Sequence, residues 1–534
     1  MIRDAISESL RAALAAAGVD APPNIELTRP ARREHGDWSS NVALAVAKAA
    51  GRNPRELAGE LATAVDADRP PHVAAVEVAG PGFVNFRLHD TWLHDVLREV
   101  VAEGVDAYAR PDATAGMRMN VEFVSANPTG PLHAGHGRWA AYGDSLARIL
   151  QRVGNTVERE FYINDRGTQM DLFAQSLIAR SAGDAPPEGG YFGDYIAEWA
   201  AEMPADADPG EWGYLRVLDE QRSTLSRMGV EFDTWFSEKS LVPNGAIEQT
   251  LAELRQRDMA YDAEGATWLR STAFGDEKDR VLVKSDGEYT YALTDIAYHR
   301  DKFGRGFERL INVWGADHHG YVARLKAGVQ ALGHDPDELE VILGQLITLL
   351  RGGEPVRMSK RTGDILELDE LLDEVGPDAA RLTFLLQSID TRQSVDIDVV
   401  RSESMENPVF YVQMAHARLA SIQRVAAERA VKRLPLEQVD LALLVHEREL
   451  DVLRSLAELE EAVVEAAADR APHKITTWVR GLAGRVHGFY HDCYVLGDDV
   501  PRELTQARLW LVEAARIGLA IGTDLLGVHA PDAM

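Results

Sequence analysis

The stretch from Arg118 to Gly154 constrains the fold more than any other part of this sequence. It opens on an apolar run that contains Val121 and Phe123, passes through a glycine-rich turn, and then repeats large apolar residues at helical spacing. An apolar strand, a glycine turn and an amphipathic helix in this order are typical of the opening of a parallel α/β sheet. We therefore expect such a sheet, with this turn at the end of its first strand.

The 534 residues divide into three regions with different residue patterns. Residues 1–112 mix helical stretches with short strands, whereas residues 396–534 are almost wholly helical. Residues 113–395 carry the α/β pattern, and an insertion is expected at about 184–275, where acids, Trp, Gly and Pro accumulate. The expected fold class is α/β, a parallel-sheet domain with an N-terminal α+β domain and a C-terminal all-α domain.

Composition narrows the class of protein and its compartment. Acidic residues outnumber basic ones by 85 to 56, and the net charge of −29 argues against indiscriminate binding of nucleic acid, DNA included. The single cysteine, Cys493, excludes an intrachain disulfide and favours a reducing compartment, with the cytoplasm as the default. The most apolar window, Val341–Leu350, is too short to span a membrane, and we expect no membrane partner.

The turn Pro128–Arg138, which we call the histidine turn, has the sequence PTGPLHAGHGR. Its glycines let a ligand approach the backbone, and the helix that follows offers unpaired amide donors and a positive dipole end, which suits a phosphate chain. Its histidines add donors aimed at the same place. A surface loop with ordinary histidines and a metal pair remain as alternatives, although further metal ligands are missing. The residues concerned are Gly130, Gly135, Gly137, His133 and His136.

A second cluster lies more than two hundred residues later, in the loop-like run Pro355–Asp364, PVRMSKRTGD. Arg357, Lys360 and Arg361 supply three cations that are able to close over a polyphosphate. A basic loop on an acidic protein is also often a solvated surface. Both clusters together, in this order around an α/β domain, favour adenylate transfer, which needs a histidine–glycine cradle and a mobile lysine.

These two clusters, HAGH at 133–136 and RMSKR at 357–361, resemble the signature motifs of class I aminoacyl-tRNA synthetases. Further stretches over the whole chain are similar to arginyl-tRNA synthetases: VEFVSANPTGPLHAGHGR, EFYINDRGTQ, YALTDIAYH, GPDAARL and DLLGVHAP. The resemblance implies a tRNA-contacting domain at 1–112, a Rossmann-type catalytic domain at 113–395 and a helical anticodon-binding domain at 396–534.

The reaction that the resemblance implies is activation of L-arginine with ATP to arginyl-adenylate and pyrophosphate, followed by transfer to the 3′-terminal ribose of tRNA-Arg. ATP is then a substrate accompanied by Mg²⁺, no protein-bound metal is expected, and the chain is expected to act as a monomer. Three alternatives remain: a class I synthetase for another amino acid, a nucleotidyltransferase-like enzyme that shares the histidine turn, and a paralogue that only binds tRNA.

Carried over by position, the resemblance assigns roles to individual residues. Catalysis falls to His133, His136 and Lys360, and ATP binding to the three glycines of the histidine turn with Arg357, Met358, Ser359 and Lys360. Arginine binding falls to Glu122, Ser125, Asn127, His136, Tyr291, Asp295 and Asp317.

The physical chemistry of arginine agrees with part of this set. A guanidinium is a planar fork that pairs with carboxylates, and Glu122 and Asp295 can supply them, although ordinary strand-end acids are the alternative. Arg357 and Arg361 depart from the class I pattern of Lys and Ser, so we assign phosphate stabilisation to Lys360. Asp317 stands where relatives carry an amide, which makes its role the least secure.

Binding of tRNA by so acidic a chain must use local basic patches. The stretch Val409–Arg433 holds five basic residues against one acid, which predicts a stripe that contacts the RNA backbone, or else a solvated helix face. A second region near the N-terminus resembles the family's contact with the tRNA elbow. The predicted tRNA-binding residues are Arg32, Arg33, Trp38, Asn41, Arg418 and Arg424, and Trp478, Tyr490, Tyr494 and Trp510 are the candidates for anticodon stacking.

Overall fold

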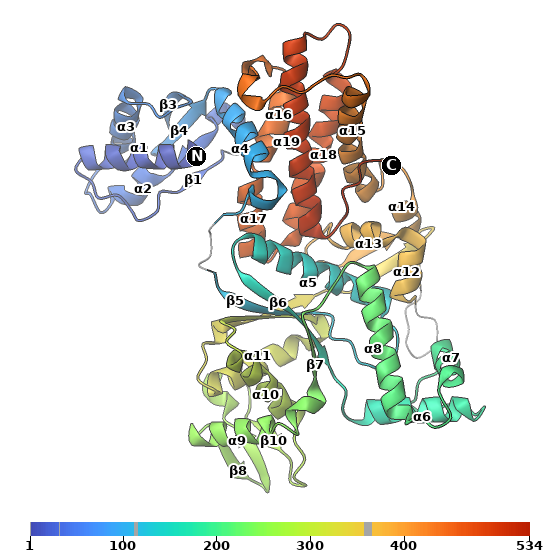
Figure 1. Ribbon diagram of the computed structural model, residues 1–534. Coiled ribbons are helices and arrows are strands. Elements are labelled where there is room, and N and C mark those ends of the chain that lie inside the picture. The colour runs from blue at the N-terminus through green and yellow to red at the C-terminus, as the bar shows by residue number, and fades with distance from the viewer. Residues whose placement is uncertain (1, 31, 112–115, 357–365) are drawn as a thin grey trace. The chain divides into compact units, whose positions relative to one another are not determined.

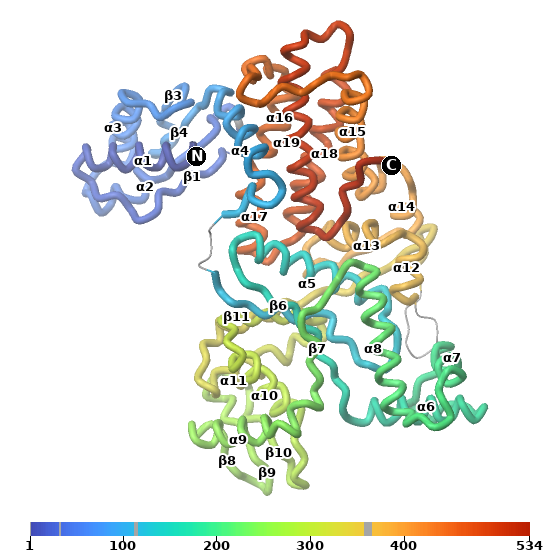
Figure 2. The backbone as a smooth tube through the Cα atoms, viewed as in Figure 1, coloured from blue at the N-terminus to red at the C-terminus, as the bar shows by residue number. Residues whose placement is uncertain are grey.

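The computed structural model describes residues 2–30, 32–111, 116–356 and 366–534. Figure 1 labels the elements of the chain, and Figure 2 follows its backbone. The chain forms two compact units, which are described separately. One unit comprises residues 1–104, 422–457 and 488–515, and the other comprises residues 105–421, 458–487 and 516–534.

The N-terminal part of the first unit is an antiparallel four-stranded sheet, in the order β1-β2-β4-β3, with helices packed on it. Its core includes the fully buried side chains of Leu10, Leu57 and Phe86. The side chain of Asn53 begins α3 by accepting a hydrogen bond from the amide of Arg55, 2.9 Å away. The elements are α1 (Ile2–Ala16), β1 (Leu27–Thr28), a 3₁₀ turn (Arg33–His35), β2 (Trp38–Ser40), α2 (Val42–Ala47), α3 (Pro54–Ala67), β3 (Val73–Ala79), β4 (Phe83–Leu88) and α4 (Thr91–Ala107).

The second unit is built around five parallel strands in the order β12-β11-β5-β6-β7, so the predicted parallel sheet is confirmed. From β5 the chain adds β6 and β7 on one side and later β11 and β12 on the other. Open α/β sheets bind ligands at such a reversal, outside the carboxyl ends of the strands. The strands are β5 (Arg118–Glu122), β6 (Thr156–Ile163), β7 (Thr234–Ser237), β11 (Arg309–Gly315) and β12 (Leu339–Gly344).

Helices connect these strands, and smaller modules interrupt the connections. Three helices lie between β6 and β7, and an antiparallel sheet in the order β10-β9-β8 lies between β7 and β11. The stretch 184–275 therefore also supplies β7, the edge strand of the main sheet. The elements are α5 (Ala134–Arg152), α6 (Thr168–Ser181), α7 (Asp194–Glu202), α8 (Pro209–Arg227), a 3₁₀ turn (Glu238–Leu241), α9 (Ala246–Gln256), β8 (Ala260–Ala263), β9 (Ala266–Leu269), a 3₁₀ turn (Ser271–Phe274), β10 (Arg280–Val283), α10 (Tyr291–Gly304), a 3₁₀ turn (Ala316–His318), α11 (His319–Ala331) and a 3₁₀ turn (Pro336–Glu338).

A third small sheet, in the order β14-β13-β15, and a run of helices complete the chain. Their presence confirms the predicted fold class, with its helical C-terminal region. None of the helices in the described ranges is long and apolar enough to cross a lipid bilayer. The elements are β13 (Ile347–Arg351), β14 (Glu354–Pro355), α12 (Leu368–Val375), α13 (Pro377–Phe384), β15 (Gln393–Asp396), α14 (Ile397–Arg401), α15 (Pro408–Glu428), two 3₁₀ turns (Leu436–Gln438 and Leu441–Leu443), α16 (Glu447–Ala457), α17 (Leu459–Ala468), α18 (Pro472–Asp492) and α19 (Arg502–Leu526).

Candidate active site

The histidine turn leaves the end of β5 and leads into α5. His133 precedes the first residue of that helix, and its ring stacks on the ring of His136 with a centroid separation of 3.7 Å. The backbone amide of His133 also donates a hydrogen bond to Nδ1 of His136, over 3.2 Å. Both rings are thus held side by side at the positive end of a 19-residue helix, where an anion is favoured.

Packing within the protein requires the glycines of the histidine turn, in addition to any close approach of a ligand. A Cβ atom at Gly137 would lie 2.7 Å from the Phe384 ring, and one at Gly130 would lie 2.8 Å from the hydroxyl of Tyr195. At Gly135 the nearest atoms belong to the His133 ring, 2.9 Å away. The space over these glycines is therefore occupied by protein side chains, which fix the shape of the turn.

The segment that directly follows the second predicted cluster is hydrogen-bonded to the histidine turn. The amide of Ala134 donates to the carbonyl of Leu366 over 3.0 Å, and the amide of Leu368 donates to the carbonyl of Leu132 over 2.7 Å. On the other side of the cluster, the amide of Val356 donates to Leu349 of β13 over 2.8 Å. Residues 357–365 themselves, with Arg357, Met358, Ser359, Lys360 and Arg361, lie outside the described residues.

Glu122 ends β5 and is nearly inaccessible, with 5% of its surface exposed. One carboxylate oxygen, Oε2, accepts a hydrogen bond from the buried ammonium of Lys302 over 2.6 Å. The other, Oε1, accepts from the hydroxyl of Ser125 over 3.2 Å. Val124 and Ser125 both have left-handed backbone angles, with φ of 66° and 41°. A β-branched residue tolerates this conformation poorly, so the turn that aims Ser125 at Glu122 is strained, as is common at functional sites.

Asp295 lies in α10 and accepts a short hydrogen bond from the Tyr321 hydroxyl of α11. Burial, with the negative charges of Glu122 and Glu238, raises the pKa of Asp295 to about 7. Burial also raises the pKa of Glu238, while a hydrogen bond from Tyr162 acts against that rise. We call Glu122, Glu238 and Asp295 the carboxylate cluster. It is a group of acids that is costly to ionise together and is therefore suited to a cationic ligand.

Glu238 is a member that the sequence analysis did not assign. It directly follows β7, so it occupies a strand end, as Glu122 does. The strand-end position was the available signal, but β7 has only four residues and lies in the stretch interpreted as an insertion. Tyr162 and Tyr321, whose hydroxyls bond Glu238 and Asp295, were also missed because a tyrosine is as often a core residue.

The remaining predicted arginine-binding residues are held less tightly. Tyr291 begins α10 and is 71% exposed. Asn127 lies in the loop after β5 and donates its amide to Gln169 over 2.9 Å. Asp317 follows β11, is exposed, and has His318 as its closest cationic neighbour, at 3.6 Å. Tyr291 and Asp317 are therefore exposed, whereas Glu122 is buried.

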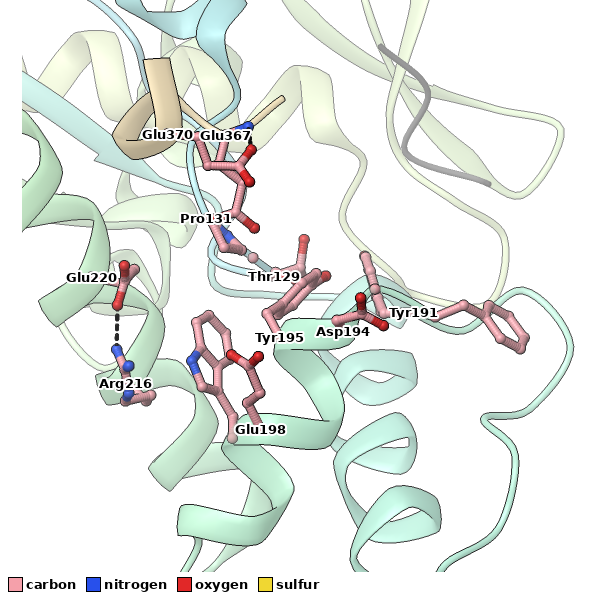
Figure 3. Close-up of a pocket in the computed structure, with 14 residues that line it drawn as sticks. Thr129, Pro131, Tyr191, Asp194, Tyr195, Glu198, Arg216, Glu220, Glu367 and Glu370 are labelled. Carbon is pink, nitrogen blue, oxygen red and sulfur yellow. Dashed lines mark hydrogen bonds and ion pairs between the residues drawn. The ribbon is translucent and has the colours of Figure 1, made fainter. Parts of the chain in front are cut away.

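An acidic cavity of about 400 Å³ is lined in part by Thr129, Gly130 and Pro131 of the histidine turn (Figure 3). Four of its lining residues are aromatic, and its single arginine, Arg216, is paired with Glu220 over 2.6 Å. Burial and the charges of Glu370 and Glu220 raise the pKa of Glu367 to about 7. Its lining residues are Thr129, Gly130, Pro131, Tyr191, Phe192, Gly193, Asp194, Tyr195, Glu198, Trp199, Arg216, Glu220, Glu367 and Glu370.

No group of three or more His, Cys, Asp or Glu side chains could hold a metal ion in the part of the chain that the structure describes. His318 and His319, which are adjacent in the sequence, are both exposed at the start of α11. The histidines of the turn stack on each other instead of converging on one point.

The predicted RNA contacts of the N-terminal domain differ in accessibility. Trp38 is only 3% exposed, and the guanidinium of Arg29 lies over its ring at 4.5 Å. Asn41 precedes α2 and donates its amide to a nearby glutamate over 2.9 Å. Arg32 is exposed, whereas the side chain of Arg33 falls outside the described part. The structure therefore gives Trp38 a place in the domain core, and Arg32 a place on the surface.

In the helical region, Arg418 and Arg424 both belong to α15. Arg418 is half-buried and its Nη1 lies 2.9 Å from Nδ1 of His487, whereas Arg424 is exposed. Of the aromatic candidates for anticodon stacking, Tyr490 is 41% and Tyr494 is 73% exposed. Trp478 is buried and Trp510 is half-buried, so the accessible candidates are the two tyrosines.

Comparison with known families matches almost the whole chain. The arginyl tRNA synthetase N-terminal domain matches residues 2–88, the class I (R) tRNA synthetase catalytic domain matches residues 99–185 and 212–420, and the DALR anticodon binding domain matches residues 412–534. An arginine–tRNA ligase of Frankia alni is 47% identical over 100% of this chain and 99% of its own length. One of Heliobacterium modesticaldum is 46% identical over 96% of this chain and 94% of its own. The solved arginyl-tRNA synthetase of Thermus thermophilus superposes with a TM-score of 0.76 at 25% identity, and each chain is covered completely.

Proposed function

This chain belongs to the arginyl-tRNA synthetases, and we infer that it is an arginine–tRNA ligase. It activates L-arginine with ATP to arginyl-adenylate and pyrophosphate, and then transfers arginine to the 3′-terminal ribose of tRNA-Arg. Within the site, the observation that carries the inference is the carboxylate cluster, formed by the strand-end residues Glu122 and Glu238 with Asp295 of α10 and joined to the histidine turn through the loop after β5.

The carboxylate cluster supplies the arginine site in this proposal. A guanidinium is planar, keeps its charge, and presents several donors to facing carboxylates, whereas the lysine ammonium is a single point of charge. Asp295 and Glu238 form the guanidinium site, because burial raises the pKa of both and a bound cation relieves that cost. Ser125, Asn127 and Tyr291 complete the site around the amino acid, and Asp317 lies at its edge.

The histidine turn supplies the ATP site. His133 and His136 stand at the start of α5, where their donors and the helix dipole oppose the charge that grows as the arginine carboxylate attacks the α-phosphorus. The backbone amide of Gly135 belongs to the first helical turn, whose first donors have no partner within the helix, and Gly137, the fourth residue of α5, lets the start of the helix pack against Phe384. Gly130 shapes the preceding loop. These residues stabilise the transition state and the leaving pyrophosphate.

Lys360 provides the opposing cation, with Arg357, Met358 and Ser359 of the same segment closing over the nucleotide. The support for this assignment is the attachment of the segment, because Leu366 and Leu368 are hydrogen-bonded to the histidine turn. Lys360 precedes Leu366 by six positions, a length of chain that spans at most about 20 Å. Mg²⁺ enters with ATP as part of the substrate, where it neutralises phosphate charge.

Binding of tRNA involves both ends of the chain. The region that matches the DALR anticodon binding domain carries Arg418 and Arg424 on α15, which we assign to contacts with the RNA backbone. The N-terminal domain contributes Arg32 and Arg33 in the same way, and Asn41 lies close by, while Trp38 supports the domain from its core. The domain bounds 1–112, 113–395 and 396–534 remain part of the proposal. So do a monomeric chain, a cytoplasmic location and the absence of a DNA partner.

The test is charging of tRNA-Arg transcripts with labelled amino acids by the purified protein. Arginine should be attached in an ATP-dependent reaction, and lysine should be rejected by a factor on the order of 10⁴ or more, because it would leave a carboxylate of the cluster unpaired. Citrulline, which has the shape of arginine without its charge, is the matched control and should also be rejected. Charging of another amino acid in preference to arginine, or tRNA binding without charging, would contradict the proposal.

A further inference from the structure

One member of the carboxylate cluster, Glu122, forms a buried ion pair with a lysine. The ammonium of Lys302, in the last turn of α10, is 2.6 Å from Oε2 of Glu122 at the end of β5. The exposed fraction is 0% for the Lys302 side chain and 6% for that of Glu122. A buried ammonium is unfavourable unless it is paired, and two apolar side chains would serve stability as well. The position of this pair therefore calls for a reason beyond the fold.

Lys302 is itself held by a directed chain of hydrogen bonds. Its ammonium donates to Oδ1 of Asn312 over 3.3 Å, and Nδ2 of Asn312 lies 2.8 Å from Nε2 of His299. Burial lowers the pKa of His299 to about 3, so the ring is neutral and Nε2 accepts. The other nitrogen, Nδ1, then carries the proton and donates to the carbonyl of Asp295 over 2.8 Å. The chain thus links Glu122 to the backbone of Asp295.

Neighbouring buried charges have partners of their own. Glu160, on β6, accepts from Nη1 of Arg305 over 2.7 Å, from the Tyr298 hydroxyl over 2.5 Å, and from the Asn120 amide over 3.0 Å. Its charge is therefore balanced by Arg305. The ammonium of Lys302 makes its ion pair with Glu122, with the ring of Tyr298 beneath it at 4.4 Å, and its charge also acts on Glu160.

The carboxylate cluster therefore contains two kinds of acid. Glu122 has a built-in cation, whereas the described residues give the Asp295 carboxylate a tyrosine hydroxyl as its donor. Arg166 lies 3.8 Å from Glu238 and is part-exposed. Among the described residues, Asp295 therefore has no paired cation and Glu238 has a long, part-exposed ion pair. L-Arginine brings two cationic groups, the α-ammonium and the guanidinium, together with one carboxylate, so its guanidinium can supply the cation that these two acids lack.

We propose that Lys302 is a positioning residue for arginine: it fixes the Glu122 carboxylate through Oε2, so that Oε1 faces the amino acid. The inference rests on the proposed function. Without Lys302, Oε2 of Glu122 would lose its buried donor, and the carboxylate would be free to turn away from the amino acid. Lys302 acts through Glu122 and does not itself touch the substrate.

The test replaces Lys302 by methionine, which keeps most of the volume and removes the charge. In the Lys302→Met variant we expect the arginine KM to rise at least tenfold while the ATP KM stays within twofold, both measured by ATP–pyrophosphate exchange in the presence of tRNA-Arg. The matched control is Arg305→Met, which removes the more exposed cationic partner of Glu160, three positions further along the chain. It should lower the melting temperature and leave both KM values near those of the wild type.

A double-mutant cycle with Glu122→Gln separates positioning from a purely structural role. If Lys302 acts through Glu122, Lys302→Met adds no further rise of arginine KM to that of Glu122→Gln. Independent, multiplying effects would overturn the inference. If Lys302→Met alone does not fold, the double variant, which leaves no unpaired charge, should fold and match Glu122→Gln. Its failure to fold would show that Lys302 serves the fold independently of Glu122, and the inference would be wrong.

The two proposals fail in different ways. If the wild-type protein does not activate arginine, the proposed function is wrong, whatever the variants do. If the wild type activates arginine and Lys302→Met keeps its arginine KM, or changes the arginine and ATP KM together, the function stands and the role of Lys302 is wrong.

Discussion

The histidine turn and the carboxylate cluster both adjoin the carboxyl end of β5, yet they are held in different ways. The histidine turn is fixed by backbone hydrogen bonds, such as those from Ala134 and Leu368, and by glycines packed against side chains. The carboxylate cluster is fixed by side chains alone, among them Lys302 with Glu122 and the Tyr321 hydroxyl with Asp295. In the proposed function, the first region binds a polyanion, and the second is a set of charges that a cation completes.

Because the two regions are held differently, substitutions in them should change different kinetic constants. Changing a donor of the histidine turn removes stabilisation of the reacting phosphate, which lowers the rate of activation without weakening arginine binding. Changing a member of the carboxylate cluster alters the charge that receives arginine, which raises the arginine KM and changes its pH dependence. The following substitutions test whether the two regions have these separate roles.

The largest effect is expected at His136. The His136→Ala variant should form arginyl-adenylate about 10²–10³-fold more slowly, because it loses a preorganised donor at a charged transition state. Arginine KM should change less than threefold. Single-turnover kinetics measures both, and His334→Ala, a histidine stacked on Phe303 away from the turn, is the control. A normal rate in His136→Ala would remove that residue from the chemistry.

A somewhat smaller effect is expected at Asp295. Replacing it by Asn keeps the shape and removes the charge, so kcat/KM for arginine should fall about 10²-fold, as expected when a desolvated charge pair loses one partner. The ATP KM should stay constant. The control is Asp301→Asn on the same helix, which lies in an ion pair with Arg305. Equal losses for both substrates in Asp295→Asn would argue that the division of roles is wrong.

At Gly137 the expected change concerns stability. A methyl group there meets Phe384 and Leu368 at 2.7 and 2.8 Å, so Gly137→Ala should lower the free energy of unfolding by about 1–3 kcal/mol. Chemical denaturation measures this. Gly304→Ala is the control, since nothing lies within 4 Å of a Cβ at that position. If the two variants are equally stable, packing does not fix the turn.

The smallest effect concerns pH. Burial raises the pKa of Asp295 to about 7, so lowering the pH below 7 protonates this carboxyl and removes the charge that receives the guanidinium. The arginine KM should therefore rise about tenfold from pH 8 to pH 6, while the ATP KM does not follow. The same acid limb should be absent in Asp295→Asn. A flat arginine KM in the wild type would show that Asp295 is already ionised throughout this range.

Sequence reasoning found the parts of the site that are local in the chain. The strand, glycine turn and helix start around His133 and His136 lie within one short stretch, and Glu122, which the family resemblance assigns to arginine binding, ends the first strand. Glu238 was missed because its strand, β7, is short and lies among residues interpreted as an insertion. Nothing in a four-residue strand distinguishes it from loop sequence.

The burial of Lys302 and Trp38 could not be predicted from the sequence. A lysine near a helix end is usually a solvated cation, and its pairing with Glu122 spans 180 positions, so no local pattern predicts that it is buried. The resemblance to the family assigns Trp38 to the contact with tRNA, yet tertiary packing leaves it 3% exposed. Charge partners and burial are set by how distant segments meet, which single-sequence patterns do not contain.

The most direct test of the central claim is a crystal structure of the protein with a non-hydrolysable analogue of arginyl-adenylate. The account predicts the guanidinium at hydrogen-bonding distance, about 3 Å, from Asp295, with the phosphate mimic beside His133 and His136. A guanidinium bound instead in the acidic cavity, against Asp194 and Glu198 and with Asp295 left facing solvent, would contradict it.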